Sequence, residues 1–98
     1  MADIQFEWDS AKASANLRKH GVAFEEAETV FSDELAVLID DPDHSDEEDR
    51  FVLLGLSAAP RILAVVHAYR SAQDTIRIIS ARKATKAERT TYVKRPRP

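Results

Sequence analysis

The chain has 98 residues, a formal net charge of −3 and no cysteine. This length predicts one domain over residues 1–98, and the lack of cysteine excludes disulfides and thiolate metal sites. The negative net charge excludes nucleic-acid binding by overall charge alone. Because no secretory signal and no apolar run of about 20 residues is present, we expect a cytoplasmic protein without membrane contact.

The first third of the chain predicts one strand and two helices. Aromatic and β-branched residues favour a strand over residues 4–8. Asp9 is a typical N-cap and Gly21 a typical C′ residue, so the alanine-rich stretch over residues 10–20 predicts a helix. A second helix is expected over residues 24–32, where apolar side chains form one stripe and glutamates occupy the first turn.

The remainder predicts four strands and a third helix. The strand-like runs are residues 35–40, 50–57, 61–69 and 75–82. The last three are joined by short links that are typical of hairpins. Thr85 and Glu88 have the spacing of a capping box, which predicts a helix over residues 85–93 followed by a frayed tail over residues 94–98. The expected fold is α+β, with two N-terminal helices packed on a small, mostly antiparallel sheet and a helix at the C-terminus.

Charge is divided unevenly along the chain. Residues 25–49 carry twelve acidic side chains and no lysine or arginine, whereas residues 77–98 carry eight basic side chains and a single acidic one, Glu88. This asymmetry favours two surfaces with different partners, one of them a polyanion. The alternative is two solvated faces without partners. The two glycines cannot form a phosphate-binding glycine-rich motif.

Polar candidates lie on the last two predicted strands. Strict alternation places Arg77 and Arg82 on opposite faces of the last strand, with Arg82 at its exit. On the preceding strand, His67 and Tyr69 point the same way. If the two strands form a hairpin in a suitable register, Arg77, His67 and Tyr69 meet on one face. The sequence does not fix that register.

Each candidate also has a structural interpretation. Arg77 can serve in a cross-strand ion pair, and His67 can be an ordinary strand histidine. Glu88 already has a sufficient role in the capping box, so catalysis is its lesser alternative. Tyr92 lies four residues after Glu88 and can dock the last helix on the sheet.

The acidic stretch "DDPDHSDEEDR" invites a test for metal binding. Read as an EF-hand from Asp41, it has Asp46 where glycine is needed and Val52 where a bidentate glutamate is needed. No second histidine lies three or four residues from His44, as a zinc site would require. We therefore expect no metal and no cofactor.

Several motifs in order resemble one known family. They are "FEWD" (6–9), "KHGVAFEEA" (19–27), "DHS" (43–45) and "IRIISARKATKAER" (76–89) followed by Tyr92. Together they are similar to the BrnT family of bacterial type II toxins, and the last block is the most specific. The resemblance implies a RelE-like fold and a metal-independent ribonuclease that arrests translation. It also implies neutralisation by a BrnA-like antitoxin with a ribbon-helix-helix DNA-binding region, the complex repressing its own promoter.

Metal-free RNA cleavage by the 2′-hydroxyl needs cations for the phosphorane charge and groups that move protons. On that basis Arg77 and Arg82 are candidates for the scissile phosphate and His67 for acid–base catalysis. Tyr92 is a candidate proton donor or base-stacking residue. Steering of the RNA backbone is expected from Lys83, Lys86 and Arg89.

Two further alternatives concern the partners. The chain can be a non-catalytic binding module whose basic segment docks an antitoxin or DNA. The acidic loop can itself dock the antitoxin, through Asp46, Glu47 and Glu48.

Overall fold

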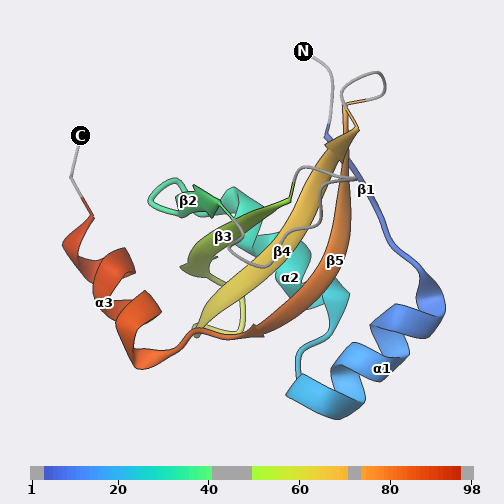
Figure 1. Ribbon diagram of the computed structural model, residues 1–98, viewed down its shortest axis with the longest axis horizontal. Helices are drawn as coiled ribbons and strands as arrows, with labels where there is room; N and C mark the ends of the chain where they lie inside the picture. Colours follow the sequence, from blue (N-terminus) through green and yellow to red (C-terminus); the bar gives the residue numbers. More distant parts are fainter. Residues whose placement is uncertain (1–3, 41–49, 71–73, 96–98) are drawn as a thin grey trace.

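The structure, a computed structural model, describes residues 4–40, 50–70 and 74–95 (Figure 1). The elements in chain order are β1 (Gln5–Glu7), α1 (Ser10–His20), α2 (Phe24–Thr29), the short 3₁₀ turn η1 (Val30–Ser32), β2 (Val37–Asp40), β3 (Phe51–Leu56), β4 (Ile62–Arg70), β5 (Thr75–Lys83) and α3 (Lys86–Lys94). The α+β class is confirmed. Lys94 belongs to α3 instead of the predicted tail, and residues 96–98 lie outside the described residues.

The sheet is mixed, which corrects the expectation of a small, mostly antiparallel sheet. Its strand order is β1-β5-β4-β3-β2, and β1 pairs with β5 in parallel while the other three pairings are antiparallel. A parallel pairing needs a long crossover connection, and here residues 8–74 lie between β1 and β5. Local hairpin signals in the sequence could not reveal it.

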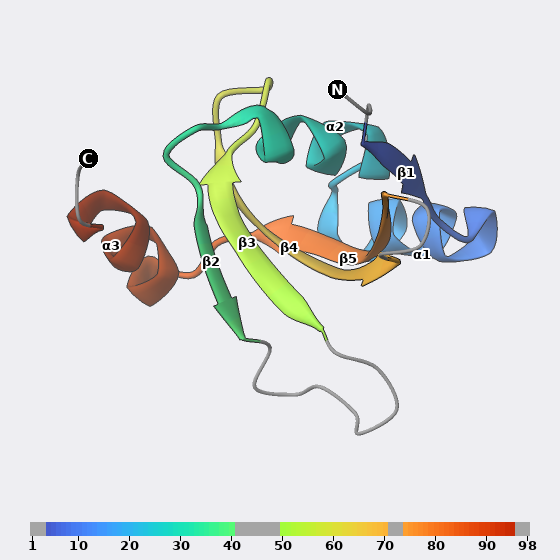
Figure 2. The same cartoon turned by 90° about the horizontal axis from the view of Figure 1, so that it is seen from above.

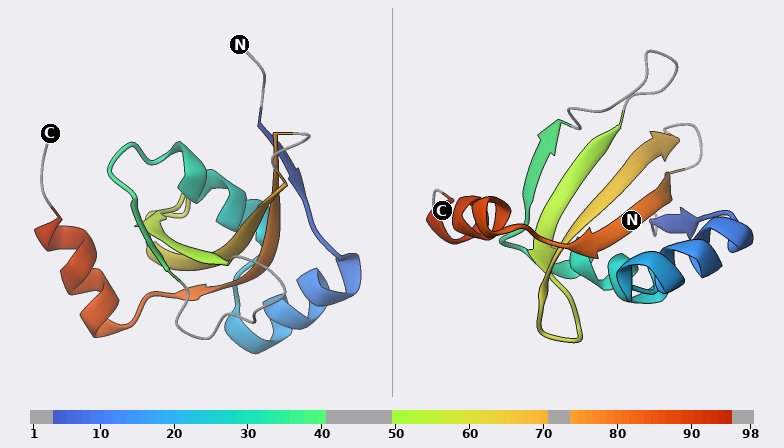
Figure 3. Two further views of the ribbon diagram at one scale, coloured as in Figure 1. Left: turned by 45° about the horizontal axis from the view of Figure 1, so that its top comes forward. Right: turned by 60° about the horizontal axis from the view of Figure 1, so that its bottom comes forward.

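α2 lies over one face of the sheet, and α1 lies beside β1 and β5 at the edge (Figures 2 and 3). The main core lies under α2. That core is formed by Val22, Phe24, Ala27, Val30, Leu63, Val65, Ile78 and Ala81. A smaller cluster of Val52, Leu54 and Ala64 lies on the opposite face. We call this second face, opposite α2, the far face of the sheet. No helix in the described part of the chain is long and apolar enough to cross a membrane.

Asn16 fixes α1 against the sheet. Its side-chain nitrogen donates to the carbonyl oxygens of Val22 and Ala81 at 2.9 and 2.8 Å, and its side-chain oxygen accepts from the Ala81 backbone N–H at 3.1 Å. Among the described residues, β1 pairs with residues 75–77 of β5 and no strand pairs with the backbone of Ala81 on that side. The buried amide satisfies those groups, whose desolvation would otherwise be costly.

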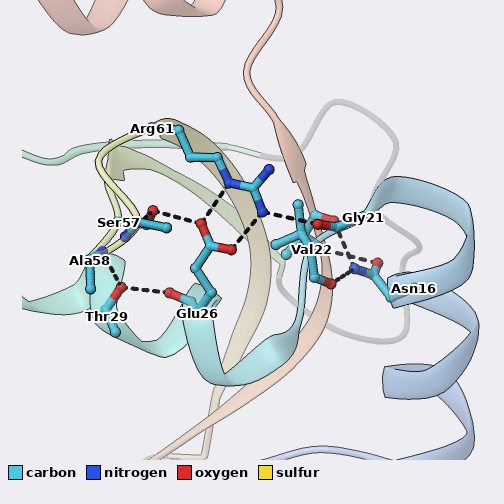
Figure 4. A network of polar contacts seen from close by, with 10 residues as sticks. Asn16, Gly21, Val22, Glu26, Thr29, Ser57, Ala58 and Arg61 are labelled. Atoms are coloured by element: carbon cyan, nitrogen blue, oxygen red, sulfur yellow. Dashed lines mark hydrogen bonds and ion pairs between the residues drawn. The ribbon is translucent and has the colours of Figure 1, made fainter.

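A second polar network holds α2 to the β3–β4 hairpin (Figure 4). Glu26 accepts from Nε and an Nη of Arg61 at 2.7 and 2.6 Å and from the Ser57 hydroxyl at 2.7 Å. Arg61 also donates to the Gly21 carbonyl at 2.9 Å, so it ties the end of α1 to the same point. The Arg61 guanidinium lowers the pKa of Glu26, which keeps the pair charged at neutral pH.

Candidate functional site

A β-bulge in β5 decides which arginines share a face. Val66 pairs with Ser80 but His67 pairs with Ile78, so Ile79 has no partner on β4. The extra residue reverses the alternation beyond it. Arg77 and Arg82, predicted to point to opposite faces, therefore both lie on the far face.

The register on either side of the bulge supports this assignment. Arg82 pairs with Ala64, a member of the far-face cluster, and Arg77 pairs with Ala68. Ile78 and Ala81 turn instead into the main core. The far face of β5 thus presents two arginines, one on each side of Ser80.

Arg82 and Glu88 form a bidentate salt bridge on this surface. Two guanidinium nitrogens of Arg82 donate to the two carboxylate oxygens of Glu88 at 2.6 and 3.0 Å. The Glu88 carboxylate also accepts from the backbone N–H of Thr85 at 2.8 Å, and the Thr85 hydroxyl accepts from the backbone N–H of Glu88. The predicted capping box is confirmed.

One carboxylate therefore joins the end of β5 to the start of α3. Hydrogen bonding to Arg82 is the largest cause that lowers the pKa of Glu88, with the Thr85 backbone bond adding to it against a burial effect that raises it. Arg82 keeps about a third of its side chain exposed and Glu88 about a fifth. The pair is thus ionised at neutral pH and open to solvent on the arginine side.

Arg77 lies further along β5. The register places Glu7 of β1 beside it, but the salt bridge of Glu7 is made with Arg70, at 2.7 Å. Arg77 forms no salt bridge within the described residues, although its charge helps to lower the pKa of Asp9. The cross-strand ion pair considered for Arg77 is therefore absent from the described part of the structure.

His67 lies on the other face of the sheet, so it does not meet Arg77 as one possible register would have allowed. Its side chain is fully buried, with ring contacts to Phe31, Phe51 and Tyr69. Its Nδ1 lies 3.0 Å from the Val65 carbonyl, and its Nε2 has no partner in the described part of the chain. Burial lowers the pKa of this imidazole and favours the neutral form.

Tyr92 docks α3 onto the rest of the fold. It is buried, and its hydroxyl donates to an Asp33 carboxylate oxygen at 2.6 Å. The same oxygen accepts from the Leu56 backbone N–H at 2.8 Å, and Arg95 stacks over the ring at 4.2 Å. Burial and then Asp33 raise the pKa of Tyr92, so the phenol stays protonated.

Asp33 was missed by the sequence analysis. Its local signal is an Asx-type turn, in which its other oxygen accepts from the Leu35 backbone N–H at 2.9 Å. That pattern identifies a turn and says nothing of a tyrosine 59 positions away. The pairing of Glu26 with Arg61 was missed because it too joins positions that are far apart in the sequence.

The three predicted RNA-steering residues extend the positive charge from Arg82 onto α3. Lys83, Lys86 and Arg89 are exposed, and Arg89 donates to the Ala84 carbonyl at 2.9 Å. The proposed antitoxin contacts Asp46, Glu47 and Glu48 lie outside the described residues. Among residues 4–40, 50–70 and 74–95, no three His, Asp or Glu side chains are grouped to share a metal ion.

Comparisons with known proteins agree with one another on the family. A family profile described as "Ribonuclease toxin, BrnT, of type II toxin-antitoxin system" matches residues 8–88. The crystal structure of the ribonuclease toxin BrnT from Brucella abortus is similar at a TM-score of 0.64 and 26% identity, covering 86% of this chain and 100% of that chain. No curated protein matches the sequence. Since the profile spans most of the chain, including both β5 arginines and Glu88, the protein belongs to the BrnT family of type II toxins.

Proposed function

We propose that this protein is an endoribonuclease toxin that cleaves RNA without a metal ion and thereby inhibits translation. The observation that carries the proposal is the bulge in β5, which gathers Arg77 and Arg82, both partly exposed, on one face of the sheet next to the basic start of α3. A chain of net charge −3 needs such a local concentration of cations to attract RNA. Membership of the ribonuclease toxin family supports the same conclusion.

Arg82 is the residue we assign to the scissile phosphate. Its planar guanidinium stays charged and binds two oxygens at once, as it already does with Glu88, so it suits the charge that develops on a phosphorane. Arg77 is five positions away on the strand, roughly 15 Å at the rise of an extended chain. We therefore assign Arg77 to a second phosphate further along the same RNA strand, with Lys83, Lys86 and Arg89 steering the backbone.

Glu88 is proposed to orient Arg82 through the two hydrogen bonds between them. A lowered pKa makes it a weak base, so orientation suits it better than proton abstraction. Full burial on the opposite face supports a structural role for His67 in place of the acid–base role expected from the sequence. The Asp33 bond supports a docking role for Tyr92 in the same way.

The antitoxin partner implied by the family is proposed to be a BrnA-like protein with a ribbon-helix-helix DNA-binding region. In that scheme the complex acts in the cytoplasm and represses its own promoter, with the DNA contacts made by the antitoxin. Covering Arg82 would be enough to inhibit the toxin, because the proposed transition-state contact is made there.

Cleavage of single-stranded RNA by the purified toxin in excess EDTA tests the activity. We expect products ending in a 2′,3′-cyclic phosphate and a turnover at least about 100-fold lower in Arg82→Ala, the usual scale for losing a transition-state donor. Arg77→Ala should weaken RNA binding more than turnover. Arg18→Ala, an exposed change on α1, is the matched control and should leave both unchanged.

Three outcomes would contradict the proposal. Loss of cleavage in EDTA with recovery in excess Mg²⁺ would refute the metal-free mechanism. Full activity of both β5 arginine variants would refute the site. No cleavage at any toxin concentration, together with normal growth on expression, would favour the non-catalytic binding module.

A further inference from the structure

One side of α3 lines a basic groove that includes Lys86 and Arg89, two of the residues proposed above to steer RNA. A hollow of about 460 Å³ lies between this helix and the start of β4. Its lining residues are Ile62, Lys86, Arg89, Thr90, Val93 and Lys94. We call it the α3 groove. Its volume is within the range of about 300–1,000 Å³ that is typical of ligand pockets.

The spacing of these residues gives the helix two different faces. Lys86, Thr90 and Val93 follow one another at intervals of four and three, so they lie along one side. Glu88 and Tyr92 lie on another side and attach the helix to Arg82 and Asp33. The inward face is thus occupied by the fold, while Val93 on the outward face is 60% exposed.

The chemistry of the groove combines an apolar floor with a cationic rim. Ile62 and Val93 supply the apolar surface, and Lys86 and Lys94 carry the rim charge. Neither lysine has an ion-pair partner among the residues that the structure describes. Arg89 is partly engaged, because one of its guanidinium nitrogens donates to the Ala84 carbonyl.

The apolar floor suits an acidic amphipathic protein segment better than RNA, whose backbone needs only the charges of Lys86 and Arg89. An apolar side chain of such a segment fits the floor while its carboxylates meet the lysines, as in helix-in-groove recognition. Single-stranded RNA is usually held by aromatic side chains on which the bases stack, and none of the described residues that line the groove is aromatic. Figures 1 and 2 show α3 at the end of the molecule opposite α1, where a partner can reach it without displacing the main core.

We propose that the α3 groove is the docking site for an acidic amphipathic segment of the antitoxin. The inference rests on the proposed function only in taking the antitoxin as the partner. The groove adjoins the Arg82–Glu88 pair through α3, so a segment anchored there is well placed to extend over the RNA surface.

The test measures the affinity of the toxin for the purified product of the neighbouring antitoxin gene by titration calorimetry. The variants are Val93→Glu and the double change Lys86→Glu with Lys94→Glu. All three positions are exposed, and circular dichroism checks that α3 remains folded. Lys12→Glu with Lys19→Glu, two exposed lysines of α1, is the matched control for net charge.

We expect each groove variant to weaken antitoxin binding at least about tenfold and the α1 control to change it less than about twofold, with a larger loss at low salt for the lysine pair. Unchanged antitoxin affinity in the groove variants would overturn the proposal. Unchanged antitoxin affinity together with weaker binding of a fluorescein-labelled 12-nucleotide oligouridylate in Val93→Glu would assign the groove to RNA instead, because Val93, unlike Lys86, has no proposed role in steering RNA. Affinity is measured without RNA cleavage, so failure of the ribonuclease proposal would not alter the readout.

Discussion

Replacing Glu88 with glutamine separates the two roles that its carboxylate has in the structure. Glutamine at the third helical position still completes a capping box, so its oxygen can accept from the Thr85 backbone N–H. It cannot supply the negative charge that holds both guanidinium nitrogens of Arg82. Thr85→Ala is the complementary change, because it removes the hydroxyl of the cap and leaves the Arg82–Glu88 pair in place.

The two changes should cost similar stability. The Arg82–Glu88 pair is partly exposed, so its loss should lower the free energy of unfolding by no more than about 1 kcal/mol. Loss of the threonine cap costs about 1 kcal/mol as well. In a domain of this size each corresponds to roughly 4–8 °C in Tm.

Activity should respond differently. An arginine that is no longer held loses its alignment with the phosphate, and misplacement of such a group lowers turnover by about 10- to 100-fold. We expect this loss in Glu88→Gln and nearly full turnover in Thr85→Ala. The assay is steady-state RNA cleavage in EDTA at a temperature well below both Tm values. Equal losses in the two variants, or full turnover in Glu88→Gln, would refute a positioning role and leave Glu88 as a cap alone.

Three other predictions concern stability and use urea unfolding. Because burial lowers the pKa of His67, its protonation favours the unfolded state, so stability should fall as pH drops below about 6.5, by up to about 1.4 kcal/mol per pH unit. His67→Phe should remove that part of the pH dependence, and identical pH profiles would contradict the buried neutral assignment. Glu26→Gln should lower the free energy of unfolding by about 2 kcal/mol, because three charge-assisted hydrogen bonds converge on this half-buried carboxylate. Glu7→Gln, in the exposed pair with Arg70, should lower it by less than about 0.5 kcal/mol. Equal losses in the two variants would count against the network. Gly55→Ala should cost about 1–3 kcal/mol, since the new Cβ would lie 2.8 Å from a Val30 methyl group, and an unchanged midpoint would show that the contact relaxes freely.

The helix signals in the sequence were local, and they located α3 well. Thr85 and Glu88 are three residues apart, and the capping box that they form depends only on the start of the helix itself. Asp9 and Gly21 likewise bound α1 as N-cap and C-cap residues. A backbone hydrogen bond that closes within one turn can be anticipated from the residues of that turn.

The parallel pairing of β1 could not be anticipated in this way. It joins Phe6 to Ile76 across the chain, and no turn residue specifies such a contact. The bulge at Ile79 was equally hidden, because one unpaired residue leaves the composition of the strand unchanged while it moves every following side chain to the other face.

The basic C-terminal segment, the capping box and the family motifs were therefore determined by the sequence alone. Tertiary structure decided that Arg77 and Arg82 share the far face of the sheet and that His67 is enclosed by aromatic rings on the other. It also decided that Tyr92 is bound to Asp33 and that Arg82 is held by Glu88. The physical reason is that a side chain's surroundings depend on strand register and on packing between distant segments, which periodicity along the chain does not encode.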